Sequence, residues 1–227
     1  MQILLCSALL LTIAVVLSTA QDYCHLSTCQ PSGAWHTMCL FPNTPGPACG
    51  SQIEAIGPTQ AERDMFLATH NNLRAFVAQG YEKRGINGAQ PKATNMETMT
   101  WDSELETIAQ RWVIQCTFGK DVCRDVARFT VGQNVGILST IGNDTFRPND
   151  ILQVWYDEVE EFNQSHIALY QDDCTVARYT QLVWAKSTRL GCSSIRYKQN
   201  GGANSYYVVC NYGPAGNIVG QPIYQTS

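Results

Sequence analysis

The sequence lacks the features that mark membrane, nucleic-acid and zinc proteins. Beyond residue 20 no apolar run approaches the roughly 20 residues that cross a bilayer. Only 15% of the residues are charged and the formal net charge is −4, which argues against nucleic acid or an anionic membrane as the main partner. There are only 4 histidines, and no Cys-x₂-Cys pair is followed by a second such pair, so a structural zinc site is disfavoured. The chain also has no internal repeat, low-complexity tract or Arg-Gly-Asp tripeptide.

The start of the chain, residues 1–20, has the composition of a secretory signal peptide. An apolar run from Leu9 to Leu17 is followed by Ser18-Thr19-Ala20, a small-x-small cleavage pattern. A charged n-region is missing, but the run is too short for the alternative, a transmembrane anchor. We therefore expect cleavage after Ala20 and a secreted, extracellular protein without a transmembrane segment.

Cysteine is abundant after this segment. In a secreted chain, an odd number of cysteines indicates a disulfide framework with one thiol left over. The cysteines concerned are Cys24, Cys29, Cys39, Cys49, Cys116, Cys123, Cys174, Cys192 and Cys210. Two N-glycosylation sequons, at Asn143 and Asn163, also suit an extracellular surface.

The mature chain divides into an extension and one larger unit. Residues 21–58 are rich in cysteine and proline and show no clean hydrophobic period, so we expect an irregular extension that disulfides hold in place. Thr59 and Glu62 form a capping box that predicts a helix from there to Gln79. Residues 59–227 are long enough for one domain with its own core.

Hydrophobic periodicity predicts helices before and after a small antiparallel sheet. This order favours an α+β fold, a three-layer α-β-α sandwich. The expected elements are a helix capped by Asp102, a strand at 131–138, a helix from about Pro148 to Phe162, a short helix at 177–187, and a hairpin with strands at 191–197 and 206–210.

Glu158 interrupts the apolar stripe that we expect on the helix beginning near Pro148. It lies four residues from Val154 and three from Trp155. A carboxylate on such a stripe is rare unless it is paired or functional, the alternative being a side chain at the margin that reaches solvent. If the short helix at 177–187 lines a cleft, the residue at Arg178 decides the chemistry there.

Several short motifs occur together, in order and at the spacing of one known family. They are His70-Asn71-x-x-Arg74, Cys116-Thr117-Phe118-Gly119 with Cys123-Arg124, Gly132-Gln133-Asn134-Val135, Trp155-x-x-Glu158, Tyr179-Thr180-Gln181-x-Val183-Trp184, and Cys210-Asn211-Tyr212-Gly213-Pro214-x-Gly216-Asn217. On these motifs the chain resembles the CAP superfamily of cysteine-rich secretory, antigen 5 and pathogenesis-related proteins. Within it, residues 22–227 are similar to insect venom or salivary antigen 5 proteins.

The resemblance implies a three-layer sandwich with a cysteine-rich N-terminal extension. It also implies a disulfide connectivity that the sequence alone leaves open. The implied pairs are Cys24–Cys39, Cys29–Cys123, Cys49–Cys116 and Cys192–Cys210. Cys174 is then unpaired, either as a buried thiol or as the link of a disulfide-bonded dimer.

Family members have a cleft with two histidines and two acidic residues, and some bind a divalent metal there. The resemblance places Lys120 and Arg178 at the histidine positions and Gln133 and Glu158 at the acidic positions. Lysine and arginine carry positive charge and only donate hydrogen bonds, so we expect no metal and no cofactor here. We expect Glu158 to pair with Arg178, with Lys120 nearby, and its pKa to be lowered by these cations.

The resemblance favours a secreted, non-enzymatic protein that binds a host protein or a small apolar ligand such as a lipid or sterol. Phe66, Phe76 and the stripe 176–184 could line a channel for such a ligand, although plain core packing is the favoured explanation for them. One alternative is a metal-dependent redox or hydrolytic enzyme, for which no Ser-His-Asp or Cys-His set is evident. Another is a blocker of a receptor, channel or protease that acts through the polar loops Lys83–Pro91, Ile141–Arg147 or Asn163–Asp173.

Overall fold

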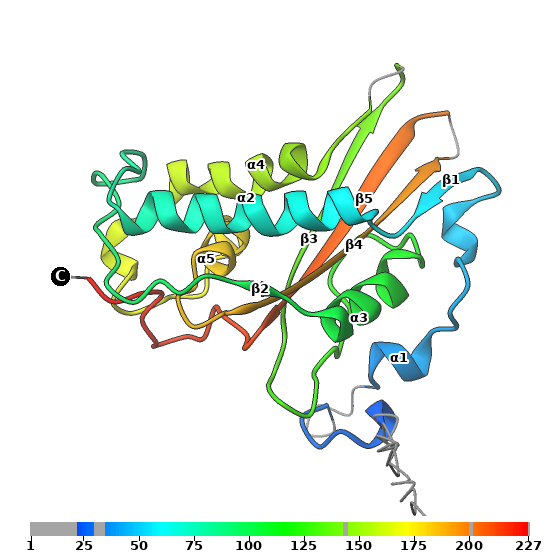
Figure 1. Cartoon of the computed structure of the whole chain (residues 1–227), viewed down its shortest axis with the longest axis horizontal. Coiled ribbons are helices and arrows are strands. Elements are labelled where there is room, and N and C mark those ends of the chain that lie inside the picture. The colour runs from blue at the N-terminus through cyan, green and yellow to red at the C-terminus, as the bar shows by residue number, and fades with distance from the viewer. Residues whose placement is uncertain (1–21, 30–34, 143–144, 200–201, 227) are drawn as a thin grey trace, which may run out of the picture.

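The computed structural model describes residues 22–29, 35–142, 145–199 and 202–226. The predicted signal peptide and the sequon residue Asn143 lie outside these ranges. The described strands form one sheet in the order β1-β4-β5-β3, with β2 paired in parallel to β4 (Figure 1). The strands are β1 (Ile53–Ile56), β2 (Thr100–Trp101), β3 (Gly132–Thr140), β4 (Arg189–Lys198) and β5 (Asn204–Gly213).

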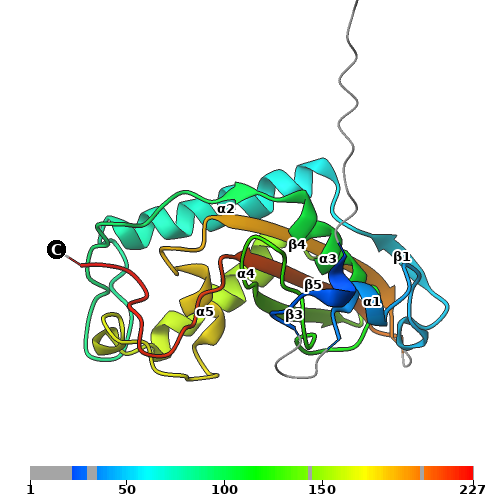
Figure 2. The same cartoon turned by 90° about the horizontal axis from the view of Figure 1, so that it is seen from below.

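Helices cover both faces of this sheet (Figures 1 and 2). One apolar cluster joins α3 to the sheet, and a second joins α2 and α4 to the opposite face. The helices are α1 (Thr37–Leu40), α2 (Gln60–Ala78), α3 (Ser103–Val113), α4 (Pro148–Asp157) and α5 (Ala177–Leu182). The three-layer α-β-α sandwich expected from the sequence is confirmed.

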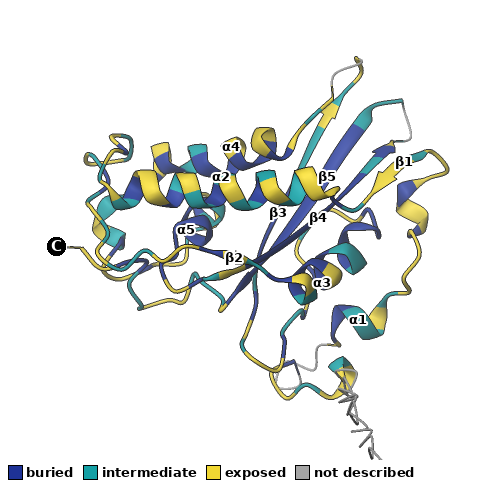
Figure 3. Ribbon diagram, viewed as in Figure 1, coloured by how far each residue is buried: buried dark blue, intermediate teal, exposed yellow. Residues whose placement is uncertain are grey.

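The centre of the sheet is buried on both faces, as the dark strands β4 and β5 in Figure 3 show. Tyr206 and Val208 pack toward α2 and α4, whereas Tyr207 and Val209 pack toward α3. This alternation is that of a strand whose successive side chains point to opposite faces. The central hairpin therefore forms the common core of the two helical layers.

Helix α2 begins and ends as its local sequence predicts. The Thr59 hydroxyl accepts a hydrogen bond from the Glu62 backbone N–H, and the Glu62 carboxylate accepts one from the Thr59 N–H. Gly80 follows with a φ of 72°, a conformation that favours glycine. Phe76 is 41% exposed and packs edge-on against Tyr81, so the core packing expected for it is wrong. The buried face of α2 consists of Phe66, His70, Arg74 and Val77.

Helix α4 is shorter than expected. It ends at Asp157, and a 3₁₀ turn, η4 (Glu158–Glu161), takes the chain to Phe162. Val154, which we placed on the buried stripe, is 49% exposed. The departure from the α-helix occurs at Glu158, whose carboxylate binds the backbone of α5.

The N-terminal extension is less irregular than its composition suggests. It contains α1 and the strand β1, which pairs antiparallel with β4 through an irregular register between Ile53 and Ala55. It also contains the 3₁₀ turns η1 (Tyr23–His25) and η3 (Pro47–Cys49). Between η4 and α5 the chain forms η5 (Gln164–His166).

Four disulfides join the described cysteines in the pairs that the family resemblance implies. Two of them tie the extension to the segment after α3, and one links β4 to β5. The pairs are Cys24–Cys39, Cys29–Cys123, Cys49–Cys116 and Cys192–Cys210. No helix in the described part of the chain is long and apolar enough to cross a membrane.

Candidate functional site

Glu158 and Arg178 meet where α4 ends and α5 begins. Glu158 Oε1 forms an ion pair with Arg178 Nε. Glu158 Oε2 accepts hydrogen bonds from the backbone N–H groups of Arg178, at 2.8 Å, and Tyr179, at 3.0 Å. The Glu158 side chain is 8% exposed and that of Arg178 is 39% exposed. The carboxylate is therefore held by a cation and by the first turn of α5 together.

Burial raises the pKa of Glu158 above its ordinary value of 4.5. The backbone N–H of Tyr179, the charge of Arg178 and the Arg178 N–H act in the opposite direction, but they do not offset the loss of solvation. The lowered pKa expected from the sequence is therefore wrong. The attraction of the partly exposed Arg178 guanidinium offsets only part of the free energy lost when the Glu158 carboxylate is removed from water.

The other two positions that the family resemblance places in the cleft, Lys120 and Gln133, differ in their surroundings. Lys120 is exposed, and the pKa of its ammonium is lowered by desolvation and by repulsion from Arg124 and Arg178. Gln133 is buried, and both ends of its amide form hydrogen bonds. Its Oε1 accepts from the Asp121 N–H at 3.2 Å, and its Nε2 donates to the Asn211 side-chain oxygen at 3.0 Å.

These four side chains do not fit a divalent metal ion. Zinc is bound by neutral imidazole, thiolate or carboxylate groups, whereas Lys120 and Arg178 are cations. Of the four, Glu158 alone is a carboxylate, and both of its oxygens already contact α5 or Arg178. The Gln133 amide is held between two protein groups.

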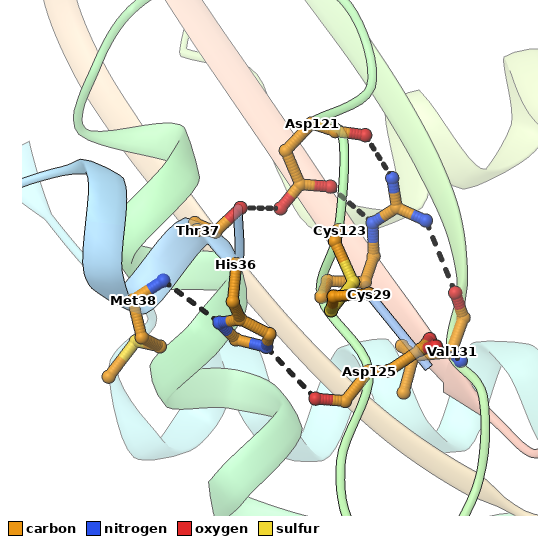
Figure 4. The surroundings of a disulfide bond; sticks show 9 residues. Cys29, His36, Thr37, Met38, Asp121, Cys123, Asp125 and Val131 are labelled. Atoms are coloured by element: carbon orange, nitrogen blue, oxygen red, sulfur yellow. Dashed lines mark hydrogen bonds and ion pairs between the residues drawn. A yellow bond between two sulfur atoms is a disulfide. The ribbon is translucent and has the colours of Figure 1, made fainter. Parts of the chain in front are cut away.

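The loop before β3 is held to the N-terminal extension by a buried polar network (Figure 4). The Asp121 side chain is 0% exposed, accepts a hydrogen bond from the Thr37 hydroxyl and pairs with Arg124. His36 hydrogen-bonds through Nε2 to the Asp125 backbone oxygen at 2.9 Å. This network was not predicted, because Asp121 and Thr37 are far apart in the sequence and neither lies in a recognisable motif.

The same region brings three possible ligand atoms together, from Cys29, Cys123 and Asp125. The two sulfur atoms are joined to each other in a disulfide (Figure 4), so neither is available as a thiolate. The Asp125 carboxylate accepts a hydrogen bond from the Val131 N–H at 2.7 Å. This cluster therefore stabilises the loop and does not offer a metal site.

His70 is fully buried in the core. Because the Phe66 backbone oxygen can only accept, His70 Nδ1 carries the proton and donates to it at 2.8 Å. His70 Nε2 faces the Tyr212 hydroxyl at 2.9 Å. Burial lowers the pKa of His70 to about 4. His70 therefore stays neutral and structural at physiological pH.

Arg74, the last residue of the same motif, fixes the end of α5. Its guanidinium donates to the backbone oxygens of Leu182, Trp184 and Ala185 at 3.0, 2.8 and 3.1 Å. It also donates to the Glu97 oxygen through two nitrogens. The motif thus anchors the helix that carries Arg178, without contacting the cleft itself.

An apolar groove of about 150 Å³ adjoins the cleft. Phe118 is 61% exposed and Val154 is 49% exposed at this surface. The groove was not predicted from the sequence, because Val154 was expected on a buried stripe and Phe118 was noted only as part of a motif. The lining residues are Phe118, Val135, Gly136, Ile137, Ile151, Val154, Trp155 and Arg178.

Two further predicted positions lie on the surface outside this cleft. Cys174 is a free, exposed cysteine, so of the two alternatives left open by the sequence the buried thiol is wrong. Asn163 is partly exposed, and its side-chain oxygen accepts a hydrogen bond from the Ser165 N–H at 3.0 Å.

Residues 67–212 match the sequence model of the cysteine-rich secretory protein family, CAP. The chain therefore belongs to the CAP family, as its fold and motifs indicate. It is similar to venom allergen 3 of Solenopsis invicta, with 47% identity over 211 residues that make up 91% of this chain and 90% of that protein. Its similarity to venom allergen 5 of Rhynchium brunneum, at 43% identity over 226 residues, covers 98% of this chain and 97% of that protein.

Solved structures give the same fold. Na-ASP-1 matches with a TM-score of 0.61 and 29% identity, over 75% of this chain and 43% of that one. NaASP2, solved with Zn²⁺, matches with a TM-score of 0.59 and 31% identity, over 74% of this chain and 87% of that one. The zinc ion belongs to the latter protein.

Proposed function

We propose that this chain is a secreted, non-enzymatic binding protein of the venom allergen 5 type, which recognises a partner outside the cell. Its full-length similarity to venom allergens 3 and 5 supports the class of protein. Four disulfides support an oxidising, extracellular environment. The partner is a host factor, contacted through the cleft and the adjoining groove.

The observation that carries this proposal is the Glu158–Arg178 ion pair at the family's cleft. It uses the carboxylate internally and places a cation where a metal ligand would have to lie. The cleft residues Lys120, Gln133, Glu158 and Arg178 also include no hydroxyl or thiol nucleophile with an imidazole base beside it. These residues therefore favour binding over metal-dependent or nucleophilic catalysis.

Calorimetric titration with zinc and with copper(II) at pH 7 tests this proposal. We expect that neither ion binds stoichiometrically at Glu158, because Lys120 and Arg178 beside it are cations. Any weak binding elsewhere should be the same in Glu158→Gln. A tight one-to-one complex that is lost in Glu158→Gln would overturn the proposal and restore the alternative of a metal-dependent enzyme.

A small apolar ligand is the second candidate, because the groove beside Arg178 is lined mostly by aliphatic and aromatic side chains. Its volume of about 150 Å³ is below the range of roughly 300–1,000 Å³ for sites that bury a drug-sized molecule. This size favours a side chain or a short alkyl group over a whole sterol. Mass spectrometry of the extracted protein tests the candidate, and a stoichiometric co-purified lipid would establish it in place of a protein partner.

The processing of the chain follows from the same proposal. Residues 1–20 are the signal peptide, 21–58 the disulfide-held extension and 59–227 the CAP domain. The exposed Cys174 is available for a disulfide-linked dimer, and Asn143 and Asn163 are available for glycans. The intact mass of the secreted protein, before and after reduction and deglycosylation, tests each of these points.

A further inference from the structure

Strand β3 has an open edge. It pairs with β5 along its whole length, from Gly132 opposite Tyr212 to Thr140 opposite Asn204, and no described strand pairs with its other side. Figures 1 and 2 show it at the margin of the sheet. Edge strands are commonly protected by charged residues or proline, but β3 contains neither. The outer backbone groups of β3 therefore pair with no described strand, and the strand is buried at residues 133–136 and partly or fully exposed at residues 137–140.

The apolar groove straddles this edge. Three successive residues of β3 line it, and successive side chains of a strand point to opposite faces. Gly136 faces α4, since a Cβ atom built there would lie 2.5 Å from Ile151 Cδ1. Val135 and Ile137 belong to the cluster on the α3 side. The backbone edge of β3 thus lies between apolar surfaces contributed by both helical layers.

One end of the groove carries the guanidinium of Arg178, whose Nε is paired with Glu158. Arg178 lines it, and its two Nη groups donate to none of the residues that the structure describes. The backbone oxygen of Arg178 accepts a hydrogen bond from the Asn134 side chain at 2.9 Å, which places Arg178 beside the first half of β3. Lys120 forms no ion pair with any described residue. An anionic group at this end would meet donors that are not already used.

We propose that the groove binds an extended peptide segment of a partner protein, which adds to β3 as an antiparallel strand. Antiparallel strand pairing is slightly more stable than parallel pairing. Because Arg178 lies beside the first half of β3, an antiparallel peptide has its carboxyl end at Arg178. An apolar side chain just before that end enters the groove beside Val154 and Phe118, and the C-terminal carboxylate meets the guanidinium. Strand addition of this kind gains affinity from main-chain hydrogen bonds and specificity from side-chain pockets.

This inference rests on the proposed binding function and specifies the class of partner. A second copy of the chain fits less well, because its own β3 has no acidic residue to meet Arg178. A lipid would meet the apolar lining but would leave the backbone edge of β3 unpaired. A peptide with a free carboxyl end satisfies the apolar lining, the strand edge and the cation together.

The test is fluorescence anisotropy with an octapeptide of alternating valine and threonine that ends in valine and carries fluorescein at its amino end. We compare the free acid, the C-terminal amide, and two forms with alternate backbone nitrogens methylated, one in each of the two registers. Val154→Glu places a negative charge in the groove at an exposed position, and Val219→Glu, at a residue that is 66% exposed and outside the groove, is the matched control.

We expect saturable binding that weakens by about tenfold or more on amidation, on N-methylation in the register that blocks pairing, and in Val154→Glu, with no change in Val219→Glu. Absence of binding at about 1 mM peptide would overturn the inference. Equal affinity for both N-methylated registers would also overturn it, because strand pairing would then play no part. Either failure leaves the proposed function standing, since the metal titrations test that separately.

Discussion

Arg178 contacts Glu158 through two different groups, its guanidinium Nε and its backbone N–H. The ion pair therefore also fixes the first turn of α5 against the end of α4. The resemblance to the family implies an imidazole at this position, which could bind a metal ion, whereas the guanidinium of Arg178 pairs with Glu158.

Arg178→Ala should lower the free energy of unfolding by about 1–2 kcal/mol at pH 7. The cost is smaller than for a fully stranded charge, because Glu158 keeps its two bonds from the backbone of α5. Burial already raises the pKa of Glu158, and loss of the cation raises it further. The penalty should therefore shrink as the pH falls and Glu158 takes up a proton. Urea denaturation at several pH values measures this, and a pH-independent loss would contradict it.

Glu158→Gln is the matched neutral variant. The amide oxygen of glutamine still accepts from the N–H groups of Arg178 and Tyr179, and no buried charge remains. We expect the free energy of unfolding to change by less than about 1 kcal/mol, since Arg178 is partly solvated without its partner. A loss of stability as large as that of Arg178→Ala would show that the charge of Glu158 matters more than its acceptor role.

His70 should make the protein less stable in acid. Its pKa of about 4 lies below the value of about 6.5 in an unfolded chain, so the unfolded state binds the proton more tightly between these values. The contribution, about 3 kcal/mol, is fully present above pH 6.5 and is lost as the pH falls toward 4. The pKa of His36 is also lowered by burial and acts in the same direction. Nitrogen NMR of the His70 ring at pH 5 should show a neutral Nδ1–H tautomer, and a charged ring there would refute the account.

The network of Figure 4 should contribute to the docking of the N-terminal extension. Thr37→Val removes the hydroxyl that donates to the buried Asp121 carboxylate. Because Arg124 still pairs with that carboxylate, we expect a loss of about 1–2 kcal/mol. Thr107→Val removes an exposed hydroxyl on α3 and serves as the control. Equal denaturation midpoints for the two variants would show that this contact does not stabilise the fold.

The sequence predicted those elements whose signals are local. The box of Thr59 and Glu62 marked the start of α2, and Asp102 capped α3 as expected, with its side chain accepting from two N–H groups of the first turn. The end of α4 was not predictable, because it depends on contacts of Glu158 with a helix some twenty residues further along the chain. The hydrophobic periodicity of one helix does not show which of its residues will form hydrogen bonds to a different helix.

The site was predicted only in part, again because some of its properties depend on contacts between distant parts of the chain. The family motifs placed Lys120, Gln133, Glu158 and Arg178, and the pairing of Glu158 with Arg178 followed from their charges. The raised pKa of Glu158 did not, because it depends on how deeply the carboxylate is buried. The groove beside Val154 was missed as well, since it exists only where the open edge of β3 meets two helical layers.

The central claim is that Glu158 and Arg178 stabilise each other at the family's cleft. A double-mutant cycle with Arg178→Ala, Glu158→Gln and the combined variant, followed by urea denaturation at pH 7, measures that coupling directly. The account predicts a favourable coupling of about 1–2 kcal/mol, so that the combined variant is more stable than the sum of the single losses implies. A coupling indistinguishable from zero would contradict it and leave the cleft with an independent acid and an independent cation.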